Sequence, residues 1–174
     1  MLSYILAIIT GIVALGADQL TKYLVTQHFV MGESYEFLPG FLGLTYIHNT
    51  GGAWGMLGGY TWLLLSITIV VMLVCIALLL KCGVKDKLLF WAIVLVLSGG
   101  LGNMIDRIFR GGNVIDFLNF QFITFPVFNI ADCAVVLGAC LLLLHYFVDM
   151  IKESKQNRII PDKFIADSKK NEKD

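Results

Sequence analysis

Long apolar stretches alternate with shorter polar intervals along this chain, and this alternation predicts its architecture. Four stretches are long enough to cross a bilayer, because a spanning helix needs about 20 mostly apolar residues. They cover approximately residues 2–23, 60–80, 88–105 and 130–151. The pattern therefore predicts an all-α membrane protein, with a bundle of four transmembrane helices inside a membrane-embedded domain of residues 1–151.

The polar intervals outside the spans carry a second pattern. β-Branched and aromatic residues gather in residues 33–38 and 41–48, and Pro39-Gly40 between them is a turn signal. Residues 114–125 are similarly rich in such residues, and Pro126 ends that run. We expect short strands here, which would form a small extracytoplasmic antiparallel β-sheet lying on the membrane surface.

Composition agrees with a membrane protein. The chain is 57% hydrophobic and 15% charged, whereas soluble domains carry about 25% charged residues. Its formal net charge is zero, so nothing favours a nucleic-acid partner. The first apolar stretch lacks a basic leading region and a small-residue cleavage site, and we therefore expect a retained span rather than a cleaved signal peptide.

Basic residues are distributed unevenly, which predicts the orientation in the membrane. With four spans, ten of them lie on one side: Lys81, Lys85, Lys87, Lys152, Lys155, Arg158, Lys163, Lys169, Lys170 and Lys173. Only Lys22, Arg107 and Arg110 lie on the other side. Because cytoplasmic loops carry the excess of Lys and Arg, both termini should be cytoplasmic and the intervals 24–59 and 106–129 should lie outside. Residues 152–174 should form a solvated or disordered cytoplasmic tail.

Polar residues cluster where the first and third spans reach the outer side. Asp18 and Lys22 stand four positions apart and can pair, while Asn103, Asp106 and Arg107 fall on one helical face. Polar residues inside a membrane normally face the bundle interior or a cavity. They predict the polar wall of a site. The competing interpretation is a set of ion pairs, Asp18–Lys22 and Asp106–Arg107, that only holds the helix ends.

Two carboxylates flank the interval before the fourth span. Asp116 lies in Gly112-Asn113-Val114-Ile115-Asp116-Phe117, and Asp132 lies in Phe128-Asn129-Ile130-Ala131-Asp132. Asp132 stands at the mouth of an apolar run, where a carboxylate is costly: roughly 2.5–3.5 kcal/mol at the bilayer centre and less near an interface. A loop that brings both together would form an aspartyl dyad, with one acid and one base. Asn129 is a plausible N-cap that can face the same cavity.

The loop that follows the second expected strand is also distinctive. Asn49 stands beside glycines that permit unusual backbone conformations, and Trp54 suits a membrane interface. The four cysteines lack zinc-ligand spacing and the three histidines are scattered, so we expect no metal site.

Five sequence blocks together resemble the bacterial signal peptidase II family. They are Asp18–Lys22, Asn49–Trp54, Gly99–Arg107, Gly112–Phe117 and Phe128–Asp132, in the family's order, and the resemblance covers roughly residues 1–151. It implies a multi-pass aspartic endopeptidase of the bacterial plasma membrane, with its active site at the outer face. Such an enzyme removes the signal peptide from prolipoproteins by cutting before a diacylglyceryl-modified cysteine.

The resemblance also implies roles for individual residues. Asp116 and Asp132 would be the catalytic dyad that activates water, with no metal and no cofactor. Nine other residues would bind substrate or shape the site: Asp18, Lys22, Asn49, Gly51, Trp54, Asn103, Asp106, Arg107 and Asn129. The partners would be diacylglyceryl-modified prolipoproteins and membrane lipids, and we expect a monomer.

Two other classes of protein use intramembrane polar residues. A small transporter or proton-conducting protein would need a relay across the membrane, but the ionisable groups gather on one side and the stretch 60–80 contains none. A non-catalytic assembly factor would use polar groups only to hold helices together. Against it, Asp116 and Asp132 have no obvious basic partner nearby in the sequence.

Overall fold

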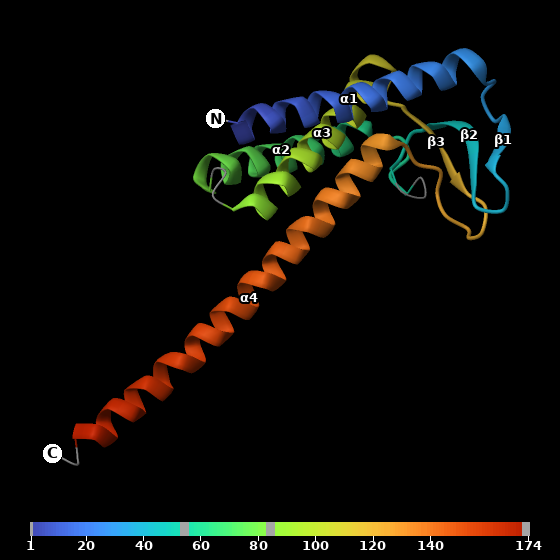
Figure 1. Ribbon diagram of the computed structural model, residues 1–174. Coiled ribbons are helices and arrows are strands. Elements are labelled where there is room, and N and C mark those ends of the chain that lie inside the picture. The colour runs from blue at the N-terminus through green and yellow to red at the C-terminus, as the bar shows by residue number, and fades with distance from the viewer. Residues whose placement is uncertain (1, 53–55, 83–85, 172–174) are drawn as a thin grey trace.

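The computed structural model describes residues 2–52, 56–82 and 86–171, and its three strands are interspersed among its four helices along the chain (Figure 1). In order they are α1 (Leu2–His28), β1 (Ser34–Leu38), β2 (Leu42–Asn49), α2 (Thr61–Cys82), α3 (Lys87–Phe109), β3 (Val114–Phe120) and α4 (Ile130–Asn171). The sheet lies beyond one end of the helices, next to the start of α4. The predicted fold class is therefore confirmed.

All four helices are long and apolar enough to cross a membrane, so this is a multi-pass membrane protein. In α3, half of the most apolar window is buried inside the protein, compared with 11% in each of the other three helices. The centre of the bundle is thus α3, and the other helices leave most of their apolar surface for lipid. Helix α1 runs to His28, beyond the predicted end near Tyr23, because its polar last turns continue the helix outside the apolar stretch.

Helices α3 and α4 approach closely where both lack side chains. A Cβ atom on Gly99 would collide with the carbonyl oxygen of Ala131, and one on Gly138 would lie 2.7 Å from Cγ2 of Val96. Small residues at helix interfaces allow such approach in membranes. The first turn of α4, which carries Asp132, is therefore pressed against the polar end of α3.

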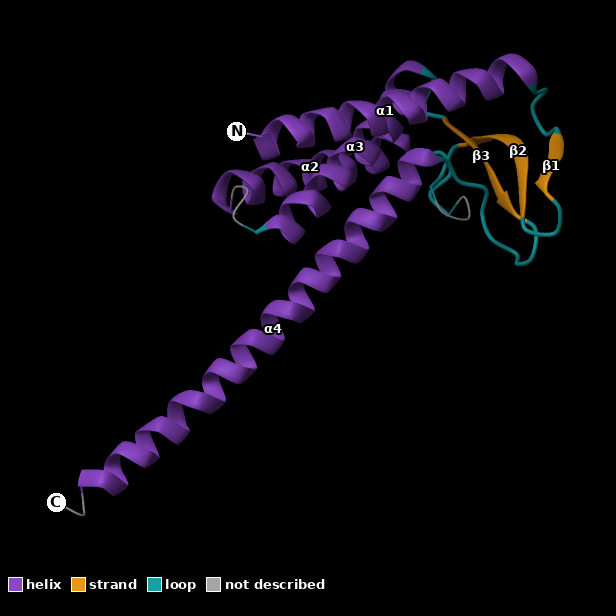
Figure 2. Ribbon diagram, viewed as in Figure 1, coloured by secondary structure: helices purple, strands orange, loops and turns teal. Residues whose placement is uncertain are grey.

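The three strands form an antiparallel sheet in the order β1-β2-β3 (Figure 2). The turn between β1 and β2 contains Gly40 in a left-handed conformation, as the Pro-Gly signal indicated. Strand β3 pairs with β2, so that Ile47 lies opposite Asp116. Ile115 and Phe117 pack against Val25 of α1, and since side chains alternate along a strand, Asp116 points to the other face.

At the opposite end of the bundle, ion pairs connect the start of α3 to α4. Nδ1 of His145 lies 3.1 Å from Asp86, the N-cap residue of α3, and Nε2 lies 3.3 Å from Asp149. Across the described ranges, this trio is the one group of His, Cys, Asp and Glu side chains close enough to hold a metal ion. Both ring nitrogens face carboxylates, however, which is the arrangement of a histidine between two hydrogen-bond acceptors.

Helix α4 continues well past the membrane span. We expected a solvated or disordered tail after residue 151, and the helix runs to Asn171, so the described part of the tail is helical. No glycine interrupts residues 139–171, and Lys, Glu and Gln are good helix formers, so the polar segment can extend the preceding helix even though Pro161, an unfavourable residue inside a helix, lies within it.

Candidate active site

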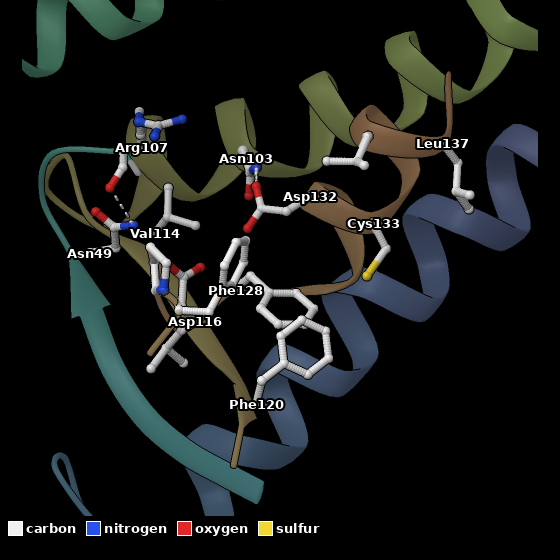
Figure 3. Close-up of a pocket in the computed structure, with 15 residues that line it drawn as sticks. Asn49, Asn103, Arg107, Val114, Asp116, Phe120, Phe128, Asp132, Cys133 and Leu137 are labelled. Atoms are coloured by element: carbon white, nitrogen blue, oxygen red, sulfur yellow. Dashed lines mark hydrogen bonds between the residues drawn. The ribbon is translucent and has the colours of Figure 1, made fainter. Parts of the chain in front are cut away.

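Asp116 and Asp132 line the same pocket, a cavity of about 480 Å³ between the sheet and the start of α4 (Figure 3). Asp116 comes from the middle of β3 and is 1% exposed. Asp132 comes from the first turn of α4 and is half-buried. The fold therefore brings together two carboxylates that are separated by a loop and a turn in the sequence.

Asp132 is held by the local geometry at the start of α4. Its backbone N–H donates to Oδ1 of Asn129 at 2.9 Å, and the backbone N–H of Asn129 donates to Oδ2 of Asp132 at 3.1 Å. This reciprocal pair resembles a capping box, in which residues three apart satisfy the free N–H groups of a helix start. Asn129 thus caps α4, as its position in the sequence indicated.

Side-chain amides from three further positions orient the two carboxylates. Asp116 accepts hydrogen bonds from Nδ2 of Asn49 at 2.7 Å and from Nδ2 of Asn129 at 2.6 Å. Asp132 accepts one from Nδ2 of Asn103 at 2.7 Å. An amide nitrogen can only donate, so these contacts fix the direction of each carboxylate. They also place amides from β2, α3 and the start of α4 around one pair of acids.

Lys22 fixes the orientation of Asn103. The lysine is fully buried, and its Nζ lies 2.9 Å from Asp18, 2.9 Å from Asp106 and 3.1 Å from Oδ1 of Asn103. Oδ1 of Asn103 also accepts from Asn129 at 3.0 Å. With its oxygen facing two donors, the amide of Asn103 has to present its nitrogen to Asp132.

The charges behind the pocket balance one another, and all of them except that of the partly exposed Arg110 are buried. Asp18 and Asp106 carry two negative charges, while Lys22 and Arg110 carry two positive ones, and Nε of Arg110 lies 3.1 Å from Asp106. The suggested Asp106–Arg107 pair is therefore wrong: Asp106 pairs with Lys22 and Arg110. Arg107 instead lines the pocket (Figure 3). Its buried Nε finds no hydrogen-bond partner among the residues that the structure describes.

The pKa of the Asp116 carboxyl group is raised to about 7, and burial is the largest cause. The negative charge of Asp132 also raises this pKa, while the hydrogen bonds from Asn49 and Asn129 and the charge of Lys22 partly offset the rise. Two carboxyl groups in one site cannot both ionise cheaply, so the pair titrates in separate steps. The site therefore retains a proton close to neutral pH.

The predicted site residues fall into two layers. Asn49, Asn103, Arg107, Asp116 and Asp132 line the pocket. Asp18, Lys22, Asp106 and Asn129 lie behind it and hold those residues. The backbone N–H of Gly51 donates to Oδ1 of Asn49 at 2.9 Å and so orients that amide. Trp54 lies outside the described residues.

Two contributions to the site were not predicted. The amide of Gln19 donates to Asp18 at 3.0 Å and to Asp106 at 3.3 Å, which ties α1 to α3 behind Lys22. In the sequence, Gln19 could have been found from its position between Asp18 and Lys22 in the first of the five blocks. The apolar half of the pocket was also missed: Phe120, Phe125, Pro126, Val127, Phe128, Cys133, Val136 and Leu137. Phe120 and Phe125 were assigned to a strand and Cys133, Val136 and Leu137 to a span, while residues 126–128 fell between the two. Such patterns do not show which side chains face a cavity.

Helices long enough to span a membrane, together with a pocket lined by two carboxyl groups, are features expected of a membrane-embedded enzyme of the aspartic peptidase class. The family model described as signal peptidase (SPase) II matches residues 10–148, and the chain belongs to this family. The resemblance carried by the five sequence blocks is thus confirmed. Membership of a peptidase family decides against the transporter and the assembly factor.

Known relatives match most of the chain. The lipoprotein signal peptidase of Bacillus pumilus is 41% identical over 152 residues, which cover 86% of this chain and 95% of the relative. That of Enterococcus faecalis is 42% identical over 134 residues, covering 77% and 83%. A bacterial membrane enzyme solved at 2.3 Å resolution has a TM-score of 0.75 and 33% identity, covering 83% of this chain and 88% of that one.

Proposed function

We propose that this protein cuts prolipoproteins just before their diacylglyceryl-modified cysteine and that Asp116 and Asp132 are its catalytic dyad. Its family and the names of its relatives support the removal of a signal peptide from prolipoproteins. The observation that carries the dyad is the pocket itself, where side-chain amides hold two carboxyl groups in fixed directions. The dyad needs neither a metal nor a nucleophilic side chain.

One acid of the dyad is protonated and the other is charged when a substrate arrives. The charged acid takes a proton from a water molecule as that water attacks the scissile carbonyl carbon. The protonated acid donates a hydrogen bond to the developing oxyanion and then passes its proton to the leaving nitrogen. The raised pKa of Asp116 supports this mechanism, because the proton is retained near neutral pH.

Charge balance supports a singly charged dyad. The group of Asp18, Lys22, Asp106 and Arg110 is neutral as a whole. Arg107 is then the cation beside a dyad that bears one negative charge. We assign to its buried Nε–H the role of a donor to a carbonyl oxygen of the substrate, since an unpaired buried donor is costly and a ligand would satisfy it.

Purified protein in detergent should cleave a diacylglyceryl-modified precursor peptide at the bond before the modified cysteine. The same peptide without lipid should be cleaved at least about tenfold less efficiently, because each buried methylene contributes about 0.8 kcal/mol to binding. Mass spectrometry of the products identifies the bond, and kcat/KM compares the peptides. Equal cleavage of both peptides, or cleavage at another bond, would contradict the proposed specificity.

The site is proposed to face the outside of the plasma membrane, with both termini in the cytoplasm. Lys81, Lys87 and Lys152 lie at the bundle ends away from the dyad, which agrees with the excess of basic residues on the cytoplasmic side. A site at the outer interface suits a substrate whose acyl chains lie in the outer leaflet.

Reporter fusions test this orientation. A reporter joined after Gly58 should be located outside, and one joined after Asp86 should be cytoplasmic, since α2 lies between them. An alkaline phosphatase and a fluorescent protein, which are active on opposite sides of the membrane, give complementary readouts. Reversal of both locations would contradict the orientation, and identical locations would contradict the spanning of α2.

A further inference from the structure

The apolar half of the pocket has two separate parts. One is the face of α4 formed by Cys133, Val136 and Leu137, which follow Asp132 into the membrane span. The other is formed by aromatic side chains of β3 and the loop after it, Phe120, Phe125 and Phe128 (Figure 3). Asp132 belongs to the same helix as the first part, and Asp116 belongs to the same strand as Phe120 of the second part.

The aromatic part extends beyond the pocket as a cluster of five rings. We call Phe41, Phe120, Phe122, Phe125 and Phe128 the phenylalanine cluster. The centroid of the Phe120 ring lies 4.9 Å from that of Phe128, 5.6 Å from Phe125, 5.4 Å from Phe122 and 6.3 Å from Phe41. The rings of Phe41 and Phe122 stack in parallel, with centroids 5.2 Å apart. Contacts between rings therefore lead without a break from the pocket to the far end of the sheet.

Exposure increases along this cluster away from the dyad. Phe120 and Phe128 are half-buried, whereas Phe41 is 52% exposed and Phe122 is 54% exposed. The segments 34–42 and 118–128 that surround them contain a single charged residue, Glu36. Large exposed apolar patches mark membrane or ligand contacts, so this cluster is unusual for segments that lie outside the spans.

The proposed substrate has an apolar group on each side of its scissile bond. The apolar signal segment precedes the bond and reaches into the membrane, and the diacylglyceryl group is attached to the residue just after it. The two apolar parts of the pocket are arranged in the same way. The α4 face continues into the span, while the phenylalanine cluster comes from β3, the loop after it and the turn before β2, beyond one end of the helices.

We infer that the phenylalanine cluster is the docking surface for the acyl chains of the diacylglyceryl group, while the α4 face lies against the signal segment. The inference rests on the proposed function and specifies where its lipid is bound. Acyl chains that leave the pocket over Phe128 and Phe120 reach the stacked rings of Phe41 and Phe122, which gives a long chain more contact than a short one.

The test uses the double variant Phe41→Ser/Phe122→Ser and two precursor peptides of one sequence, carrying dioctanoyl or dipalmitoylglyceryl groups in the same detergent micelles. The wild-type protein should cleave the long-chain peptide with the higher kcat/KM. In the double variant the long-to-short ratio of kcat/KM should fall about tenfold, mainly through KM for the long-chain peptide. The single variant Phe41→Ala should lower the ratio in the same direction, and thermal unfolding verifies that both variants are folded.

Phe109→Ser is the matched control. Phe109 is 79% exposed at the end of α3 on the same side of the bundle, and the ring contacts of the described cluster do not include it. The control should keep the wild-type ratio. An equal fall in the control would show general contact of exposed apolar side chains with the detergent micelle and overturn the inference. An unchanged long-to-short ratio in the double variant would also overturn the inference. So would an equal loss of kcat/KM for both peptides, which is the result expected if these side chains contact the signal segment. Failure of the wild-type protein to cleave either peptide would instead contradict the proposed function.

Discussion

Asp116→Asn and Asp132→Asn should each reduce cleavage of the lipidated precursor by at least about 1,000-fold, the scale expected for residues that act as one catalytic unit. An amide is nearly isosteric with a carboxyl group, but it neither accepts the proton of the attacking water nor supplies one to the leaving nitrogen. The double variant should be no worse than either single variant. The measurement is kcat/KM for each purified protein at equal concentration.

Asp149→Asn is the control for this experiment, because Asp149 lies far along α4 and pairs only with His145 and Lys152 among the described residues. It should retain wild-type activity. Substantial cleavage by either dyad variant would exclude the mechanism. Loss of activity that merely follows loss of folded protein would instead point to structural carboxylates.

The dependence of folding stability on pH further distinguishes a catalytic role of Asp116 from a structural one. The pKa of Asp116 is about 7 in the folded protein, compared with about 3.9 in an unfolded chain. Between these values the folded state binds more protons than the unfolded state, so stability falls as pH rises through about 7. Asn at this position cannot ionise. The unfolding temperature of the Asp116→Asn variant should therefore fall less between about pH 4 and pH 8 than that of the wild-type protein.

Lys22→Met should destabilise the protein by about 3–5 kcal/mol, the usual cost of removing one partner of a buried ion pair. Two fully buried carboxylates, Asp18 and Asp106, would lose the ammonium group that lies 2.9 Å from each. Asn103 would also lose the donor that fixes its amide, so activity should fall in the protein that still folds. Thermal unfolding in detergent and kcat/KM measure the two effects.

Lys152→Met is the matched control, because Lys152 is 68% exposed and also pairs with an aspartate at 2.9 Å. Exposed pairs are screened by solvent and contribute little to stability, so this variant should resemble the wild-type protein. A second variant, Lys22→Met/Asp106→Asn, should regain part of the lost stability by removing one unpaired charge. Equal stability of the Lys22 and Lys152 variants would show that the buried charge cluster does not hold the fold.

Patterns that depend on neighbours along the chain could be predicted from the sequence. Hydropathy identified the four spans, and spacing of four residues identified the Asp18–Lys22 pair. The partners of Asp106 could not be identified in this way. Adjacent residues of a helix point in different directions, which separates Arg107 from Asp106, and Arg110 one turn later reaches it instead.

Contacts between residues far apart in the sequence could not be predicted from local sequence patterns. Asn49 and Asp116 are 67 positions apart, and Lys22 and Asn103 are 81 positions apart, yet both pairs form hydrogen bonds. The expected third strand, residues 114–125, ends at Phe120 because Phe128 returns to pair with Leu118. β-Branched and aromatic composition shows that a strand forms but does not show where a later segment replaces its continuation.

The reciprocal hydrogen bonds between Asn129 and Asp132 make the number of residues between them as important as their identity. One inserted residue would rotate Asp132 by about 100° around the axis of α4, since a helix turns once in 3.6 residues. The Asp132 carboxylate would leave the pocket, although none of the existing residues would have been substituted. An insertion in the turn at Pro39 and Gly40 would lengthen an exposed hairpin next to Phe41 and leave the dyad in place. Engineered variants of this protein can therefore change length at that turn, whereas the register of the first turn of α4 has to be kept.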